Sequence, residues 1–433
     1  MKKYGLFLAI CFLTFFSEYG YAQIKISLDS CIARALESNY SIKIIQNEQR
    51  QAENNVNYAP FLPTLDVNVS QRQNVQNSKV KTGNEERKTD GIASNVWSAG
   101  VGLNWRLFDG MEMFMSHARF QEMLQIGELR TKTAIENLIM EVSSFYYDVI
   151  RQYSKVKAAR HSLALSMARY AEARDKYVLG VLSGLEAQQA KLDLNADSSN
   201  YIKERELLKS AYISLNKSMN IDLQEYGYVD DSIVLREPLQ LRDLQENMLQ
   251  WNTTLMMGKR DQKVTELDLK IARAALFPKL DFDAGYNYSR TKTPEGTTSL
   301  NRTNGPYFGF SVSMNLFQRL ENRRKIKNAK LDVENADLSY QELELQMNAD
   351  LAQLYNTYEN NLHMVSFEKV SAEVALNNLD AALEKYKLGE LAGIEFREFQ
   401  RSYIDAVDRE VSAIYQTKMS ELSLLLISGQ ILK

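Results

Sequence analysis

The chain has few of the residues that build metal centres and disulfide frameworks. Its 433 residues include two cysteines, Cys11 and Cys31, and three histidines that lie far apart in the sequence. Two cysteines give no disulfide framework, and isolated histidines give no metal cluster. A nucleotide-binding loop, a dinucleotide fingerprint and a nucleophile elbow are also missing. We therefore expect no catalytic residue, no metal and no cofactor, and an enzyme is not predicted.

Strong net charge and long apolar runs are scarce as well. The net charge of −3 argues against a nucleic-acid partner. One apolar run, Leu6–Phe16, follows two lysines and precedes small residues, and this pattern predicts a secretory signal peptide over residues 1–22. No other run has the length of a membrane-spanning helix. Cys11 follows a bulky Ile10, so a lipid anchor is only a minor alternative.

A segment of eleven residues occurs twice in the sequence. Lys176–Glu186 and Lys385–Glu395 share seven identical residues at an offset of 209. Each copy contains a Tyr-x-x-Gly motif and a second glycine four residues later, between two helical patterns. Self-similarity at a fixed offset is typical of a duplicated architecture. The expected turn residues are Tyr177, Gly180, Gly184, Tyr386, Gly389 and Gly393.

Two further pairs extend the duplication along the chain. Leu107 and Leu316, each followed by phenylalanine, keep the offset of 209, and Pro63 and Pro278 follow at an offset of 215. We therefore predict two structural repeats, residues 23–225 and 240–433. The connection between them, residues 226–239, contains glycine, aspartates and a proline and is expected to be irregular.

Each repeat contains a segment in which apolar and polar residues alternate. In the first repeat the alternation covers residues 65–70 and 101–107, which predicts two strands with one apolar face. The polar residues 71–95 and 289–305 are expected to form loops. Such strands suit a half-buried antiparallel sheet or a transmembrane barrel, and alternation alone does not decide between the two.

Long helical patterns follow the strands. Residues 111–179 and 321–388 predict two helices of about 100 Å, at 1.5 Å per residue, and heptad spacing of apolar residues suits helix pairs. Shorter helices are expected over residues 27–58, 185–220, 239–276 and 394–427. Four strands cannot close a membrane barrel, and open edges are not tolerated in lipid, so several chains must contribute strands. Three chains give twelve strands.

In this combination of features the chain resembles the TolC family of outer-membrane efflux proteins. The similarity rests on the duplicated order, on Pro63 and Pro278 before the strands, and on the two Tyr-x-x-Gly turns. It implies a mainly α-helical homotrimer with a 12-stranded transmembrane β-barrel in the outer-membrane lipid and an α-helical tunnel in the periplasm. It also implies a passive exit duct, with a periplasmic adaptor (membrane fusion protein) and an inner-membrane transporter of the RND type or ABC type as partners.

The resemblance also implies a gate at the periplasmic entrance. Acidic residues beyond the Tyr-x-x-Gly turns match family positions that ring this aperture, and here they are Glu395, Glu398 and Glu186. Leu391 stands where some members have an arginine, and Arg397 is a candidate for the closing contact. The alternative to a duct is a secreted coiled-coil scaffold or a periplasmic adaptor, which needs no paired amphipathic strands.

Overall fold

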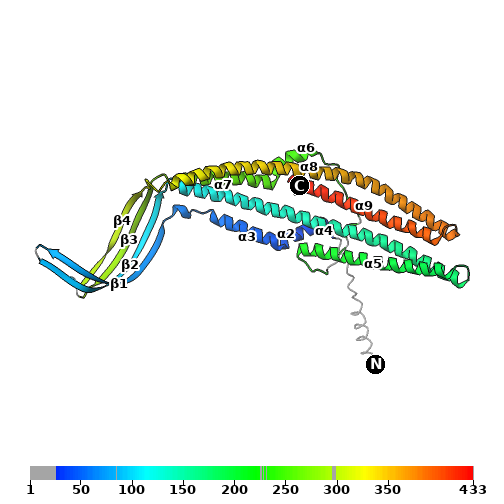
Figure 1. Ribbon diagram of the computed structural model, residues 1–433, viewed down its shortest axis with the longest axis horizontal. Coiled ribbons are helices and arrows are strands. Elements are labelled where there is room, and N and C mark those ends of the chain that lie inside the picture. Colours follow the sequence, from blue (N-terminus) through cyan, green and yellow to red (C-terminus); the bar gives the residue numbers. More distant parts are fainter. Residues whose placement is uncertain are drawn as a thin grey trace, which may run out of the picture. The chain divides into compact units, whose positions relative to one another are not determined.

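The computed structural model describes residues 26–83, 85–224, 227, 229–230, 232–294 and 299–432. The expected signal peptide, residues 1–22, and part of the expected connection lie outside these described residues. Most of this part of the chain is helical, with one four-stranded antiparallel sheet (Figure 1). None of its helices combines the length and the apolar character that a membrane span requires.

Two successive series of elements have the same order. The first series consists of α2 (Leu28–Ser38), α3 (Tyr40–Asn55), the short 3-10 helix η1 (Ala59–Phe61), β1 (Thr64–Thr82), β2 (Glu85–Phe108), α4 (Glu112–Val178) and α5 (Gly184–Met219). The second consists of α6 (Leu241–Trp251), α7 (Thr253–Ala274), β3 (Lys279–Lys292), β4 (Leu300–Ser313), α8 (Glu321–Leu388) and α9 (Gly393–Ile427). The predicted helix–strand–strand–helix duplication is confirmed, while the repeat boundaries stay predictions.

The single helix predicted before each pair of strands is wrong in both repeats, and in the same way. Asn39 separates α2 from α3 and Asn252 separates α6 from α7, with extended ψ angles of 128° and 119°. The Asn39 side-chain amide donates to the carbonyl oxygen of Ser218 (3.1 Å), and that of Asn252 donates to Ile427 (2.8 Å). The asparagine at each break therefore donates a hydrogen bond to a carbonyl near the C-terminal end of a neighbouring helix. The last carbonyls of a helix have no N–H partner within the helix itself.

The described chain forms two compact units, and the first contains its residues within 26–46, 131–253 and 345–432. Its main apolar core includes Leu138, Val142 and Val149 of α4, which are spaced by four and seven residues and are all buried. Cys31 of α2 and Leu215 of α5 pack into the same cluster and are fully buried. The heptad spacing thus places one apolar side of α4 against its neighbouring helices, as expected for paired helices.

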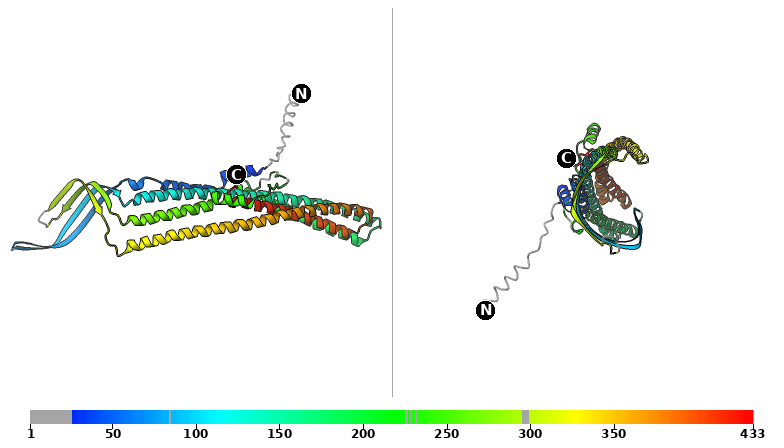
Figure 2. Two further views of the ribbon diagram at one scale, coloured as in Figure 1. Left: turned by 90° about the horizontal axis from the view of Figure 1, so that it is seen from above. Right: turned by 90° about the vertical axis from the view of Figure 1, so that its left-hand side faces the viewer.

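The second unit, residues 47–130 and 254–344, contains the sheet. Its strands follow the order β1-β2-β3-β4, all antiparallel, and the sheet is curved (Figure 2). Trp105, Phe282 and Phe310 lie side by side in register on one face, while Asp281 and Ser311 lie side by side on the other. The apolar face is Leu65, Val67, Val69, Val101, Leu103, Trp105, Phe282, Phe308, Phe310 and Val312.

This apolar face is exposed to a degree that is unusual for a sheet. Val67 is 73% exposed, Phe308 80% and Val312 72%. An ordinary antiparallel sheet covers its apolar face with a core, and within the described chain this one remains uncovered. The opposite face carries polar side chains, and Asp281 forms an ion pair with Arg106 (2.9 Å).

The strands are longer than the sequence predicts. Pairing of β1 with β2 continues to Thr82 and Glu85, and β3 continues to Lys292, so most of the loops expected at residues 71–95 and 289–305 are strand. The β1–β2 hairpin extends beyond β3 and β4 (Figure 1). Backbone hydrogen bonds carry the pairing past the point where apolar alternation ends, because they do not depend on the side chains.

Candidate functional site

The first repeat turn joins α4 to α5. Gly180 has a φ of +75° and its N–H donates to the carbonyl of Tyr177 (2.9 Å), so α4 ends in a left-handed residue that glycine adopts without strain. Ser183 then caps α5. Its hydroxyl accepts from the N–H of Glu186 (3.2 Å), and the Glu186 carboxylate accepts from the N–H of Ser183 (3.2 Å). This reciprocal pair is a complete capping box.

The second repeat turn joins α8 to α9. Gly389 has a φ of +79° and donates to the carbonyl of Tyr386 (3.0 Å), as its counterpart does in the first turn. The Glu395 carboxylate accepts from the N–H of Ala392 (3.1 Å). Ala392 has no hydroxyl to return a hydrogen bond, so only half of the capping box is present.

The second turn is held by packing as well. The ring of Tyr386 stacks on Phe396 at a centroid distance of 5.4 Å, and Phe396 is fully buried. Burial raises the pKa of Tyr386 above its ordinary value. Leu391, the departure from the family pattern, packs against the same apolar cluster. A Cβ added at Gly393 would lie 3.4 Å from the guanidinium of Arg169, so α9 begins close against α4.

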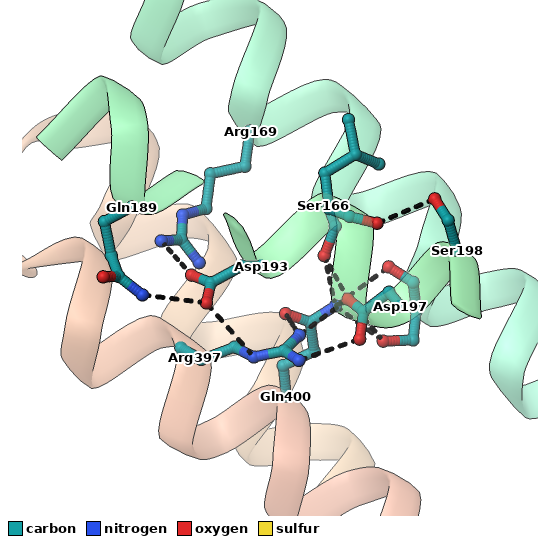
Figure 3. A network of polar contacts seen from close by, with 10 residues as sticks. Ser166, Arg169, Gln189, Asp193, Asp197, Ser198, Arg397 and Gln400 are labelled. Carbon is teal, nitrogen blue, oxygen red and sulfur yellow. Dashed lines mark hydrogen bonds and ion pairs between the residues drawn. The ribbon is translucent and has the colours of Figure 1, made fainter. Parts of the chain in front are cut away.

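Behind the turns, α4, α5 and α9 share a buried polar network (Figure 3). On α4, Ser162, Ser166 and Arg169 are spaced by four and three residues and therefore lie on one side of the helix. Asp193 and Asp197, one turn apart, face them from α5. Arg397 and Gln400 extend into the network from α9. These seven side chains, here named the tripartite network, are all buried.

Arg397 makes the strongest contacts of the tripartite network. Its two terminal nitrogens donate to the two carboxylate oxygens of Asp197 at 2.6 and 2.8 Å. Such a bidentate pair combines charge with a fixed geometry. Arg169 binds Asp193 (2.8 Å), and Arg397 Nε lies 4.0 Å from the same carboxylate. Two arginines thus balance two aspartates, and the network carries no net charge.

Gln400 completes the network with its side-chain amide. It is fully buried, and its nitrogen donates to the Ser162 carbonyl (2.8 Å) and lies 3.0 Å from the Ser166 hydroxyl. Ser166 also binds Asp197. The side chains of α9, from the second repeat, are therefore fastened to α4 and α5 of the first by hydrogen bonds from both a charged and a neutral group.

The three glutamates expected at the gate lie near the network but outside it. Glu186 and Glu395 occupy the third position of their helices, where each accepts a backbone N–H. Glu398 is exposed. Arg397, the candidate closing contact, is buried and binds within its own chain. The glycines and tyrosines of the two predicted turns lie where α4 and α8 end and where α5 and α9 begin.

Of the seven residues of this network, only Arg397 was among the candidates that the sequence indicated. A signal was present, since serine, serine and arginine at spacings of four and three on an otherwise apolar side of α4 suggest a polar contact. The complementary aspartates lie 24 to 35 residues away along the chain and the arginine more than 200. The sequence of any one of the three helices α4, α5 and α9 does not indicate which side chains of the other two it contacts.

A comparison with known protein families identifies the family that has this architecture. The model of the outer membrane efflux protein family matches residues 31–220 and 244–430. These two segments cover both series of helices and strands. The chain belongs to the outer membrane efflux protein family.

Curated relatives and solved structures agree with this assignment. The chain is 22% identical to the probable outer membrane lipoprotein SilC of Salmonella typhimurium, over 92% of this chain and 84% of that protein. It is also 22% identical to the pyoverdine export outer membrane protein OpmQ of Pseudomonas aeruginosa, over 89% of this chain and 81% of that protein.

The fold is that of solved outer-membrane channels. The Campylobacter jejuni CmeC channel superposes with a TM-score of 0.75 at 15% identity, over 93% of this chain and 86% of that one. CusC superposes with a TM-score of 0.72 at 16% identity, over 93% and 92%. The chain is therefore an outer-membrane efflux protein that serves as an exit duct, and the scaffold or adaptor alternative is not favoured.

Proposed function

We propose that three copies of the chain close one 12-stranded barrel in the outer membrane. The sheet is the observation that supports this proposal. Its apolar face is exposed, its other face is polar, and β1 and β4 each have an edge that no described strand covers. Unpaired edges are costly in lipid, where no water satisfies the backbone groups. Pairing β4 of one copy with β1 of the next removes every edge, and twelve strands suit a barrel of this class.

The long helices then continue the duct on the periplasmic side. Three copies of α4 and α8, with 67 and 68 residues, provide helices of about 100 Å at 1.5 Å per residue. A periplasmic adaptor and an inner-membrane transporter of the RND or ABC type would deliver the cargo and supply the energy. The chain itself acts passively.

The acidic residues near the turns form the gate in this proposal. Three copies of Glu398, exposed on α9, would face one narrow axis and attract cations. Glu395 and Glu186 would add charge while they hold the helix starts through their capping hydrogen bonds. A gate of this kind is closed by mutual proximity of the three copies and is sensitive to divalent cations.

Single-channel conductance of the purified protein in planar bilayers tests both parts. We expect a trimer-dependent conductance that divalent cations block from the periplasmic side. Replacing Glu398→Gln should weaken this block several-fold, because it removes three carboxylates from the axis. Glu395→Gln should act in the same direction while its side-chain oxygen still caps α9.

Glu334→Gln, on the exposed surface of α8, is the matched control and should leave the block unchanged. A conducting trimer with equal block in all variants would remove the glutamates from the gate. Absence of any trimer or conductance would overturn the duct assembly itself.

A further inference from the structure

The apolar face of the sheet ends in a group of basic and aromatic side chains. In register across three strands, Trp97 of β2 lies beside Arg290 of β3, which lies beside Arg302 of β4. Two residues further toward the hairpins, Lys292 lies on the same face. We name Trp97, Arg290, Lys292 and Arg302 the basic edge cluster.

The position of this cluster follows from the strand geometry. All four strands connect to helices at one end of the sheet, and the hairpins lie at the other end. Leu280, beside Val312, marks the helix-side limit of the apolar face. From Leu280 to Arg290 there are ten residues, or about 33 Å at 3.3 Å per residue. Because the strands of an outer-membrane barrel tilt by about 40°, this length rises about 25 Å along the barrel axis, which matches the roughly 25 Å apolar band.

The two arginines stand directly opposite each other on neighbouring strands. Like charges at such positions destabilise a sheet, because nothing separates the two side chains. Among the described residues no carboxylate forms an ion pair with Arg290, Lys292 or Arg302, although other basic residues of the sheet, such as Arg106, do have one. Within the part of the chain that the structure describes, no anion therefore offsets the repulsion in the cluster.

The surface at the cluster is hollowed. A cavity of about 430 Å³ is lined by side chains of this face only, Gln71, Asn95, Trp97, Tyr288, Arg290 and Lys292. It has a wall of two aromatic rings, which suit the boundary between lipid and water. Its polar lining includes two cations and two amides, and each of these groups has N–H donors that an anion can accept from.

We propose that the basic edge cluster binds the phosphate groups of an anionic lipid headgroup in the outer leaflet of the outer membrane. A guanidinium group can bind two phosphate oxygens at once, and the aromatic rings lie at the boundary between the headgroups and the acyl chains. The lipid supplies the missing anion between Arg290 and Arg302 and continues onto the apolar face below. This assignment rests on the proposed barrel, since only a closed barrel turns this face toward lipid.

Lipid binding to the purified trimer tests the proposal. The probes are diphosphorylated lipid A and its dephosphorylated form, added to the detergent-solubilised full chain and followed by native mass spectrometry. We expect the phosphorylated form to bind at least about tenfold more tightly, which corresponds to 1.4 kcal/mol. The double variant Arg290→Gln with Arg302→Gln should lose this preference.

Arg72→Gln is the matched control. Arg72 pairs with Val96, one residue from the Gln71–Trp97 pair, so it lies at the same height on the opposite face of the sheet. This variant should keep the wild-type preference. Equal binding of both lipids by the wild type, or an unchanged preference in the double variant, would overturn the proposal. Binding of inorganic phosphate with the same affinity as the lipid would assign the cluster to free phosphate and would also overturn it.

Trimer yield and conductance are measured on the same samples. If the double variant keeps both and loses only the lipid preference, the lipid site and the duct are both supported. If the wild type conducts as a trimer without any lipid preference, the lipid site fails alone. If no trimer forms, the failure belongs to the duct.

Discussion

The two repeat turns are built from nearly the same eleven residues but are held in different ways. The first turn is self-contained, since Ser183 and Glu186 form a complete capping box and Tyr177 is 52% exposed. In the second turn half of the box is missing, and Tyr386 packs on the buried Phe396 instead. A shared motif therefore fixes the reversal of the chain, while neighbouring residues decide whether the turn depends on the rest of the protein.

The tripartite network shows the same asymmetry. At the offset of 209, the positions equivalent to Asp193 and Asp197 are Ser402 and Ala406, and the position equivalent to Arg169 is Asn378. Among the described residues, this buried charged network is therefore present at one of the two places that the duplication makes equivalent. It joins the start of α9 to the first repeat, so the second turn is the one whose position depends on long-range contacts.

The largest expected effect is at Arg397. Replacing Arg397→Met leaves the buried carboxylate of Asp197 without its partner, and breaking a buried pair in this way costs about 3–5 kcal/mol. Denaturant titration of the detergent-solubilised protein, followed by circular dichroism, measures the loss. The double variant Arg397→Met with Asp197→Leu should recover most of it, because no buried charge remains unpaired.

Gln188→Met is the control for Arg397→Met. Gln188 is the equivalent residue of the first repeat at the offset of 209, and it is exposed. Its replacement should change the stability by less than about 0.5 kcal/mol, as is usual for surface positions. Equal losses at the two positions would contradict the asymmetry of the network.

A smaller effect, equal in both turns, is expected at the left-handed glycines. Gly180 and Gly389 have φ angles of +75° and +79°, and no atom lies within 4 Å of an added Cβ at either. Replacement by alanine therefore costs only the backbone strain, about 1–2 kcal/mol each. The same titration measures both variants. A clearly larger loss at one of them would mean that the turns differ in backbone as well as in surroundings.

The smallest effect should have opposite signs in the two turns. Ser183 and Ala392 have almost identical backbone angles, −72° and 150° against −71° and 149°. Ser183→Ala removes a cap and should destabilise the protein by about 1 kcal/mol, while Ala392→Ser should add one and stabilise it by up to a similar amount. Thermal unfolding followed by circular dichroism detects both changes. Destabilisation by Ala392→Ser would show that the second turn cannot use a capping box.

The elements that depend on local spacing were predictable from the sequence. The predicted helix over residues 321–388 agrees with α8 at both ends, and the other long helix differs by one residue at each end. Glycines at the turns and an unbroken heptad pattern set these limits. The alternation of residues 65–70 and 101–105 likewise predicted which side chains lie on each face of the sheet, because successive residues of a strand point to opposite faces.

The features that depend on a distant partner were not predictable. Asn39 and Asn252 interrupt helices that their own neighbourhoods favour, because each side chain binds a carbonyl about 175 to 179 residues away. Leu107 was expected on the apolar face, but the register shifts between Arg106 and Phe108, and such a bulge has no marker in the sequence. The polar outer halves of β1 and β2 were assigned to loops for the same reason, since strand pairing supplies what side-chain alternation does not.

Electron cryo-microscopy of the protein in lipid nanodiscs is the most direct test of the proposed assembly. We expect a particle with three-fold symmetry in which the sheets of three copies close one 12-stranded barrel, with the apolar face of each sheet against lipid. The barrel should continue into a cylinder of helices. A single copy with free strand edges, or a particle whose apolar sheet face is covered by protein, would contradict it.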